Sequence, residues 1–244
     1  MIIDCHTHVG KGINLNSRMQ IDCTVDRLVF LMDKGGVDKS IVFPVFYKDY
    51  KKPNEEVSEI VRNNKRFIGF CRVTPTAPDV EEQLDYAVKE LGLKGVKMHN
   101  MDGNPTREVM DKINELKVPV LFHSGMGLSP LKFEGIIKSY PDITIILAHL
   151  GFDQDWEHMF QYPLQAFYLA RKYKNVYLDT AAATWVQYFL EQAIEEVGAD
   201  KLLFGTDSPW FYPAIAIACI NDLEISDKDK NKILGENIAQ IINV

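Results

Sequence analysis

The sequence has few cysteines, and their spacing fits neither a disulfide framework nor a cysteine metal site. The 244-residue chain contains four, none of them in a Cys-x-x-Cys arrangement: Cys5, Cys23, Cys71 and Cys219. Most lie among apolar residues, and a chain of this length can bury a sufficient core without covalent bridges. We therefore expect buried, reduced thiols in a cytoplasmic protein.

Long hydrophobic runs and basic clusters are also missing. No stretch approaches the roughly 18 apolar residues that a membrane-spanning helix needs, and Asp4 and His6 interrupt the start of the chain where a signal peptide would be apolar. Acidic residues outnumber basic ones by 34 to 27, for a formal net charge of −7. That charge disfavours nucleic acid and anionic membranes as partners. A small molecule remains the expected partner.

What the chain does contain is a regular alternation of strand and helix patterns. Short runs rich in β-branched and aliphatic residues predict eight strands, at 2–9, 40–45, 67–73, 95–100, 118–124, 143–150, 176–180 and 202–207. Stretches with helical spacing lie between them, at 25–34, 55–64, 80–91, 107–116, 131–140, 157–173 and 185–197. Thr24 and Ser226 stand where N-caps are expected.

This alternation predicts a parallel sheet, because each strand must return to the same edge through a crossover. Eight units in 244 residues match the roughly 250 residues typical of a closed (β/α)₈ TIM barrel. An open doubly wound sheet is the alternative, but it usually has a glycine-rich phosphate turn after its first strand. Here that strand ends in His6-Thr7-His8. We predict an α/β TIM barrel that forms a single domain over residues 1–244.

Five potential metal ligands occur at or near the ends of four predicted strand segments: His6, His8, His123, His149 and Asp207. Because alternate residues of a strand face the same side, His6 and His8 should project together while Cys5 and Thr7 face the helices. The carboxyl ends of barrel strands converge on the active-site mouth. Burying so many polar groups there would be costly unless they were paired or coordinated. The pattern predicts one metal site assembled from distant segments.

Several of these motifs resemble the amidohydrolase superfamily. They are the Ile-Asp-Cys-His-Thr-His start, His123 and His149 after the fifth and sixth strands, the turn Gly205-Thr206-Asp207-Ser208-Pro209, and the closing helix that begins at Ile233. The chain is most similar to the amidohydrolase-related group that contains aminocarboxymuconate-semialdehyde decarboxylase and resorcylate-type decarboxylases alongside hydrolases. The resemblance spans the whole chain but does not fix the reaction.

The resemblance implies that a catalytic divalent ion is held by His6, His8, His123 and Asp207. Imidazole and carboxylate ligands favour Zn²⁺, with Mn²⁺, Fe²⁺ or Co²⁺ as alternatives. His149 would then be a catalytic acid, base or electrophile beside a single ion, or a ligand of a second ion. Asp207 would also be catalytic, taking a proton from water and passing it to the leaving group.

Three functions fit such a site. We expect first a hydrolase of a small-molecule amide, ester, lactone or related bond, which uses a metal-activated water. The alternative is a non-hydrolytic decarboxylase, a lyase that releases carbon dioxide from a small carboxylate with the same ion. A zinc-binding module without catalysis is the third, and it is disfavoured because structural zinc sites are closed, unlike one in a barrel mouth.

Other polar residues at strand ends are candidates for substrate binding. Lys97 and His99 share one face of the fourth strand. Lys97 could bind a substrate carboxylate, or it could be carboxylated and bridge two ions as in two-metal members of the superfamily. Arg72 suits a carboxylate equally well, unless Asp179 or another acid neutralises it. Trp210 either lines the pocket or packs behind it. Together they indicate a small, anionic substrate, and they leave open the oligomeric state, for which a homodimer is the commonest case.

Overall fold

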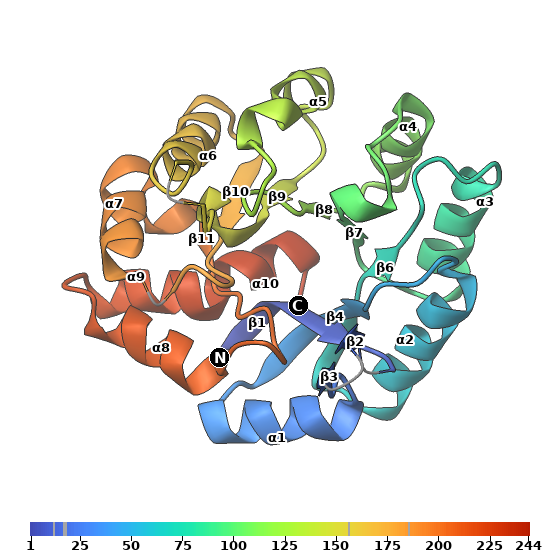
Figure 1. The fold of residues 1–244 in the computed structure, drawn as a ribbon, viewed down its shortest axis with the longest axis horizontal. Coiled ribbons are helices and arrows are strands. Elements are labelled where there is room, and N and C mark those ends of the chain that lie inside the picture. The colour runs from blue at the N-terminus through green and yellow to red at the C-terminus, as the bar shows by residue number, and fades with distance from the viewer. Residues whose placement is uncertain (12, 17–18, 156, 185) are drawn as a thin grey trace.

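The described chain forms a ring of parallel strands with helices around it, as Figure 1 shows. The structure is a computed structural model that describes residues 1–11, 13–16, 19–155, 157–184 and 186–244. The ring contains β1 (Ile3–Val9), β4 (Lys39–Pro44), β5 (Phe67–Gly69), β6 (Cys71–Arg72), β7 (Val96–Met98), β8 (Val120–Phe122), β9 (Ile145–Leu147), β10 (Val176–Asp179) and β11 (Leu202–Leu203). The neighbouring strands that pair within it are all parallel.

The third barrel strand is observed as two short pieces, β5 and β6, because its pairing changes sides at Phe70. The amide of Phe70 donates to the Val42 carbonyl of β4 at 2.9 Å, and the next amide, that of Cys71, donates to the Gly95 carbonyl before β7 at 2.8 Å. One segment therefore links the β1-β4-β5 sheet to the sheet that runs from β6 to β11.

Backbone hydrogen bonds also join the last strand to the first. The Cys5 amide donates to the Phe204 carbonyl at 2.8 Å, and the Asp207 amide donates to the His6 carbonyl at 2.8 Å. The ring is therefore closed, which confirms the predicted TIM barrel and excludes the open doubly wound sheet.

The outer helices lie close to the predicted ranges. They are α1 (Val25–Gly35), α2 (Lys51–Asn63), α3 (Val80–Asp85), α4 (Arg107–Leu116), α5 (Glu134–Ser139), α6 (Gln161–Lys172), α7 (Gln187–Val197), α8 (Pro213–Asp222), α9 (Asp227–Asn231) and α10 (Asn237–Ile242). The predicted caps are confirmed. The side chains of Thr24 and Ser226 each accept a hydrogen bond from the backbone amide three residues later in the chain. The predicted start of the helix at 185–197 lies outside the described residues.

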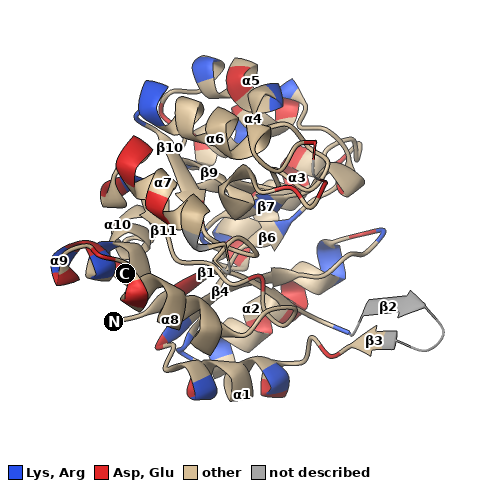
Figure 2. Cartoon of the chain, turned by 60° about the vertical axis from the view of Figure 1, so that its left-hand side comes forward, with Lys and Arg blue, Asp and Glu red and all other residues tan. Residues whose placement is uncertain are grey.

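Charged residues are frequent on the outer helices of the barrel, for example on α1, α5 and α9, where Figure 2 colours them blue and red. Two apolar clusters lie beneath them, a large one between strands and helices and a smaller one inside the ring. The inner cluster includes Ile238 and Ile242 of α10 together with inward-facing strand residues. Full burial of one such side chain contributes roughly 1.5–3 kcal/mol, so these clusters hold the strand ends in fixed positions.

One prediction about the first strand was wrong. Between Asp4 and Thr7, three steps along β1 correspond to two along β4, from Ser40 to Val42, so β1 contains a bulge. Cys5 consequently packs in the inner cluster and does not face the helices. Strict alternation holds only for an unbroken ladder, and a bulge re-aims the side chains that follow it.

Two further observations bear on the sequence-based expectations. Cys5, Cys71 and Cys219 are free thiols, and Cys5, Cys23 and Cys71 are buried, as expected for cysteines that lie among apolar residues. Among the described helices, none has both the length and the apolar character required to span a bilayer.

The hairpin of β2 (Ile13–Asn16) and β3 (Met19–Ile21) follows β1 as an addition to the barrel.

Candidate metal centre

A pocket of about 530 Å³ opens at the carboxyl ends of the barrel strands. Most of the candidate residues line it: His6, His8, Lys97, His99, His123, His149, Asp207 and Trp210. Phe46, Met101, Met126, Gln154 and Phe211 complete the lining, so apolar walls surround a polar floor. The barrel thus brings together residues from strands distant in sequence, as the strand-end pattern predicted.

Three ligand-type atoms converge on this floor. His8 Nε2 lies 2.9 Å from Asp207 Oδ1, and His6 Nε2 lies 3.4 Å from the same oxygen. A divalent ion about 2.1 Å from each ligand atom would hold neighbouring ligand atoms roughly 3.0–3.4 Å apart. The spacing of His6, His8 and Asp207 therefore fits an ion, and a divalent metal is supported by these donors.

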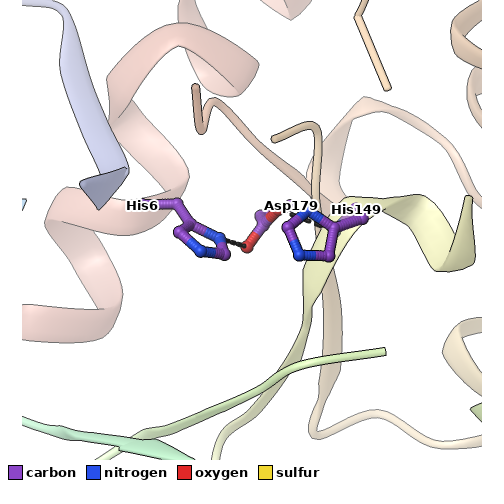
Figure 3. Close-up of side chains that lie close together, drawn as sticks. All are labelled: His6, His149 and Asp179. Atoms are coloured by element: carbon purple, nitrogen blue, oxygen red, sulfur yellow. Dashed lines mark hydrogen bonds and ion pairs between the residues drawn. The ribbon is translucent and has the colours of Figure 1, made fainter. Parts of the chain in front are cut away.

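Asp179 orients two of the histidines, as Figure 3 shows. Its Oδ2 accepts from His6 Nδ1 at 2.8 Å, while its Oδ1 accepts from the backbone amides of His149 at 2.9 Å and Ala181 at 3.0 Å. Since Nδ1 of His6 carries the donated proton, its Nε2 keeps a free lone pair toward Asp207. A carboxylate behind a ligating imidazole is a common arrangement in metal sites.

The protonation states of the ligand side chains favour binding of a cation. Burial lowers the pKa of His8 to about 4 and also lowers the pKa of His6 and of His123, so these imidazoles are neutral at neutral pH. Burial opposes ionisation of Asp207, but its hydrogen bond with His8 and the nearby imidazoles bring its pKa well below the usual range. Neutral imidazoles and an ionised carboxylate are the forms that bind metal.

Asp207 is held by the turn after β11. It has a positive φ of 63°, uncommon for a residue other than glycine. Asp4 fixes the preceding residue, because its Oδ1 accepts from the Thr206 amide at 3.0 Å and from the His6 amide at 3.1 Å. Burial raises the pKa of Asp4 to about 7. One buried side chain therefore sets the register between His6 and Asp207.

His149 and His123 form a second pair on the same floor. His149 Nδ1 donates to the Ala181 carbonyl at 3.1 Å, and its Nε2 lies 3.2 Å from His123 Nδ1. Because a carbonyl can only accept, the proton of neutral His149 is on Nδ1 and His123 donates to Nε2. Among the described residues, His123 is not part of the three-atom group of His6, His8 and Asp207. The predicted ligand set is brought into one pocket, but it is divided between two clusters.

Lys97 is fully buried between these clusters. Its Nζ lies 3.3 Å from His6 Nε2 and 5.2 Å from the centre of the Phe43 ring. Burial lowers the pKa of Lys97 to about 7, although Asp179 and Asp207 oppose that shift. A lysine in this state carries a positive charge on only part of the molecules near neutral pH.

Arg72 lies apart from the other candidates. It is completely buried, it is not among the residues that line the pocket, and its Nε donates to Asp102 Oδ2 at 2.6 Å. The sequence left open whether Asp179 or another acid neutralises it, and the partner is Asp102. That acid follows β7 in a short turn, 30 residues further along the chain, where no strand pattern distinguishes it.

Two other residues near the floor were not assigned a site role from the sequence. Asp179 was considered only as a partner of Arg72, although its position at the end of the seventh strand is the same signal that identified the histidines. Phe46 lies two residues after the end of β4 and lines the pocket. An aromatic residue in a loop gives no such signal, because its contacts depend on the fold.

A close glycine contact joins the turns that carry His123 and His149. At Gly125, which has a φ of 73°, an added Cβ would lie 2.1 Å from the Phe152 carbonyl oxygen and 2.6 Å from the Gly151 carbonyl carbon. We expect Gly125→Ala to reduce the free energy of unfolding by about 3 kcal/mol or more, because it combines backbone strain with a clash against backbone. Urea unfolding of the purified variant measures this.

Gly135→Ala is the matched control for that substitution. Gly135 lies in α5, and an added Cβ would meet nothing within 4 Å. Alanine is favoured over glycine in a helix by roughly 1 kcal/mol, so this variant should be as stable as the parent or slightly more so. Equal unfolding midpoints for the two variants would contradict the close approach of the two turns.

Comparison with known proteins adds independent findings. A family model described as Amidohydrolase matches residues 3–244. The gamma-resorcylate decarboxylase of Polaromonas sp. strain JS666 is 23% identical over 285 residues, which cover 90% of this chain and 87% of the relative. This chain is thus similar to a decarboxylase along almost its whole length.

Solved structures resemble the fold over the same extent. A dihydroxybenzoic acid decarboxylase from Polaromonas sp. JS666, with bound manganese and the inhibitor 2-nitroresorcinol, matches with a TM-score of 0.73 and 21% identity, over 99% of this chain and 96% of that one. A probable 2-pyrone-4,6-dicarboxylic acid hydrolase from Acinetobacter baumannii, with citric acid bound, matches with a TM-score of 0.77 and 16% identity. The match covers 100% of this chain and 99% of that one. At such identities the likeness shows the fold.

Proposed function

Because this chain belongs to the amidohydrolase family and is an enzyme, we propose that it is a metal-dependent decarboxylase of small hydroxylated aromatic carboxylates. The observation that carries the proposal is the convergence of His6, His8 and Asp207 on the floor of an aromatic-walled pocket. Sequence analysis alone favoured a hydrolase, with a decarboxylase as the alternative. The similarity to a decarboxylase over 90% of this chain favours the alternative.

We assign the ion to His6, His8 and Asp207, with His123 as the fourth ligand. The ion would supply a positive charge that binds oxygen atoms of the substrate and stabilises negative charge as it develops there. Imidazole and carboxylate donors suit both manganese and zinc. The sequence-based preference was zinc, but the manganese in a solved neighbour makes Mn²⁺ the first choice here and Zn²⁺ the second.

The walls of the pocket favour a flat, anionic substrate. Trp210 meets His8 edge to face with ring centroids 4.7 Å apart, and Phe46 and Phe211 add further aromatic surface. Aromatic walls bind a planar ring through offset or edge-to-face contacts. Lys97, when protonated, supplies positive charge for a carboxylate next to the floor.

Decarboxylation requires a proton at the ring carbon. The bond between that carbon and the carboxyl carbon breaks, its electron pair stays on the ring carbon and takes the proton, and carbon dioxide leaves without consumption of water. We assign the proton transfer to Nε2 of His149, the ring nitrogen beside the pocket floor. Because the neutral ring carries its one proton on Nδ1, which stays bonded to the Ala181 carbonyl, Nε2 first takes up a second proton from solvent and then passes that proton to the ring carbon. Asp179 keeps this histidine in place through its backbone amide.

A substrate panel tests the proposal. The manganese-loaded enzyme is incubated with 2,6-dihydroxybenzoate and 5-carboxyvanillate, the acids after which two decarboxylases of this fold are named, and carbon dioxide and aromatic product are quantified together. We expect carbon dioxide and the decarboxylated phenol in equal amounts with at least one acid. Absence of carbon dioxide with both, combined with hydrolysis of 2-pyrone-4,6-dicarboxylate, would contradict it.

Hydrolysis remains the second candidate. The ionised Asp207 carboxylate, hydrogen-bonded to His8, is well placed to accept a proton from water beside an ion. The fold similarity to a probable 2-pyrone-4,6-dicarboxylic acid hydrolase is as high as that to the decarboxylases. The same panel separates the two reactions, because only hydrolysis incorporates an oxygen atom from labelled water into the organic product.

A further inference from the structure

Arg72 is a buried cation whose position outside the pocket lining calls for an explanation. Its Nε pairs with Asp102, its Nη1 donates to the Pro44 carbonyl at 3.2 Å, and its Nη2 has no hydrogen-bond partner among the described residues. A buried ion pair contributes little net stability once the cost of removing both charges from water is counted. The role of Arg72 therefore depends on what it holds in place.

What Arg72 holds is the carboxylate of Asp102. Arg72 donates to Oδ2 at 2.6 Å, and the hydroxyl of Tyr50 donates to Oδ1 at 2.6 Å, so both oxygens are fixed. Tyr50 is itself buried. Asn54 locks the backbone of Arg72, accepting from its amide at 3.0 Å and donating to its carbonyl at 2.9 Å. The group anchors the turn after β7 rigidly to the second and third barrel strands.

That turn determines which ring nitrogen of His99 carries the proton. The Asp102 amide donates to the His99 carbonyl at 2.9 Å, and the Met101 amide donates to His99 Nδ1 at 3.1 Å. A backbone amide can only donate, so Nδ1 is unprotonated and the proton of the neutral ring is on Nε2.

Arg72 supports the same imidazole from a second direction. Its guanidinium lies 4.0 Å from the centre of the Phe46 ring, and Phe46 meets His99 edge to face with ring centroids 4.9 Å apart. The opposite contact is a stack on His123, with centroids 3.9 Å apart and 25° between the planes. The plane, the tautomer and the position of His99 are thus all fixed before any ligand binds.

We propose that Arg72, Asp102 and Tyr50 form a positioning clamp that holds His99 as a neutral Nε2–H donor to an oxygen atom of the bound substrate. His99 lines the pocket, whereas the clamp lies behind it and acts through the β7 turn and Phe46. Arg72 thereby has a role without touching substrate. The identity of the substrate rests on the proposed decarboxylase function, but the state of the His99 ring in the free protein does not.

Two substitutions in the clamp test it, with a surface substitution as the control. Asp102→Asn removes the charge that pairs with Arg72, and Tyr50→Phe removes only the hydroxyl that binds the same carboxylate. Asp33→Asn removes the partner of Arg66, an ion pair of the same 2.6 Å length in which the Asp33 side chain is 60% exposed. If Asp102→Asn does not fold, Tyr50→Phe decides the outcome.

The first readout is the tautomer of His99, observed by nitrogen-15 NMR of histidine-labelled, zinc-loaded protein and assigned with His99→Gln. We expect one Nε2–H tautomer in the parent and in Asp33→Asn, and a mixture of tautomers in the clamp variants. The second readout is steady-state kinetics with the best substrate of the panel. KM should rise about tenfold, the loss of one hydrogen bond to a charged group, while kcat and bound metal stay within about twofold.

An unchanged tautomer and an unchanged KM in a folded clamp variant would overturn the proposal. A changed tautomer with an unchanged KM would overturn the proposed contact between His99 and substrate, because loss of the Nε2–H donor would then have no effect on substrate binding. Failure of the decarboxylase proposal is distinguishable, because the parent enzyme would release no carbon dioxide while the NMR readout would still decide whether the clamp fixes His99.

Discussion

Asp207→Asn is expected to reduce kcat/KM by at least about 10³-fold while the barrel stays folded. The substitution keeps the size of the side chain but removes the only negative charge among the three converging atoms. Loss of that charge weakens a divalent site and eliminates a proton acceptor at the same point. Kinetics with the best aromatic acid, metal content of the dialysed protein and thermal unfolding together measure the effect.

Asp200→Asn is the control for that prediction. Asp200 pairs with Lys232 at 2.9 Å with its side chain 76% exposed, and it lies outside the pocket lining. A surface ion pair contributes little, so activity, metal content and stability should match those of the parent. If Asp207→Asn kept more than a tenth of the parent activity and its metal, the proposed role of Asp207 would be wrong.

His149→Asn is expected to lower kcat by roughly 10²–10³-fold and to leave the bound metal at one ion per chain. General acid catalysis typically contributes 10²–10⁴-fold, and asparagine cannot deliver the proton. Asparagine is the appropriate replacement because His149 has a φ of 65°, a left-handed conformation that asparagine tolerates better than most residues. Metal analysis beside single-turnover kinetics separates the two effects.

His158→Asn provides the comparison for a histidine of no proposed catalytic role. His158 stacks on Tyr162 with ring centroids 4.6 Å apart and does not line the pocket, so kcat should be unchanged. Two ions in the parent and one in His149→Asn would instead make His149 a ligand of a second ion. Parent-like kcat in His149→Asn would remove it from the mechanism.

The barrel and most of its pocket are predictable from the sequence, because both follow from local patterns. Alternating strand and helix periods identify the fold, and polar residues at the ends of apolar strands identify the pocket. His6, His8 and Asp207 were found in this way without knowledge of any contact. Parallel strands in a closed barrel bring their carboxyl ends together whatever the loops do.

Features that depend on pairing between distant segments were not predictable. The bulge that turns Cys5 inward arises from the pairing of β1 with β4, and nothing in the local pattern of β1 marks it. The partner of Arg72 is Asp102, in a turn whose path depends on the packing of Tyr50. The division of the histidines into two clusters depends on where the His149 ring is held, against the Ala181 carbonyl that follows β10.

The pattern of polar residues at strand ends also could not distinguish between the two reactions. Hydrolysis and decarboxylation need the same ion and the same set of charged groups, so His6, His8 and Asp207 are consistent with both. The similarity to a decarboxylase over 90% of the chain changes the order of the two candidates. Aromatic side chains such as Phe46 and Trp210, which enter the pocket from loops, are the part of the structure that agrees with this change.

The most direct test of the account is anomalous diffraction from a crystal of the manganese-loaded enzyme. The account predicts one manganese peak on the pocket floor, within about 2.0–2.3 Å of His6 Nε2, His8 Nε2 and Asp207 Oδ1. A peak held only by His123 and His149, or no peak in the pocket of a fully loaded and active enzyme, would contradict it.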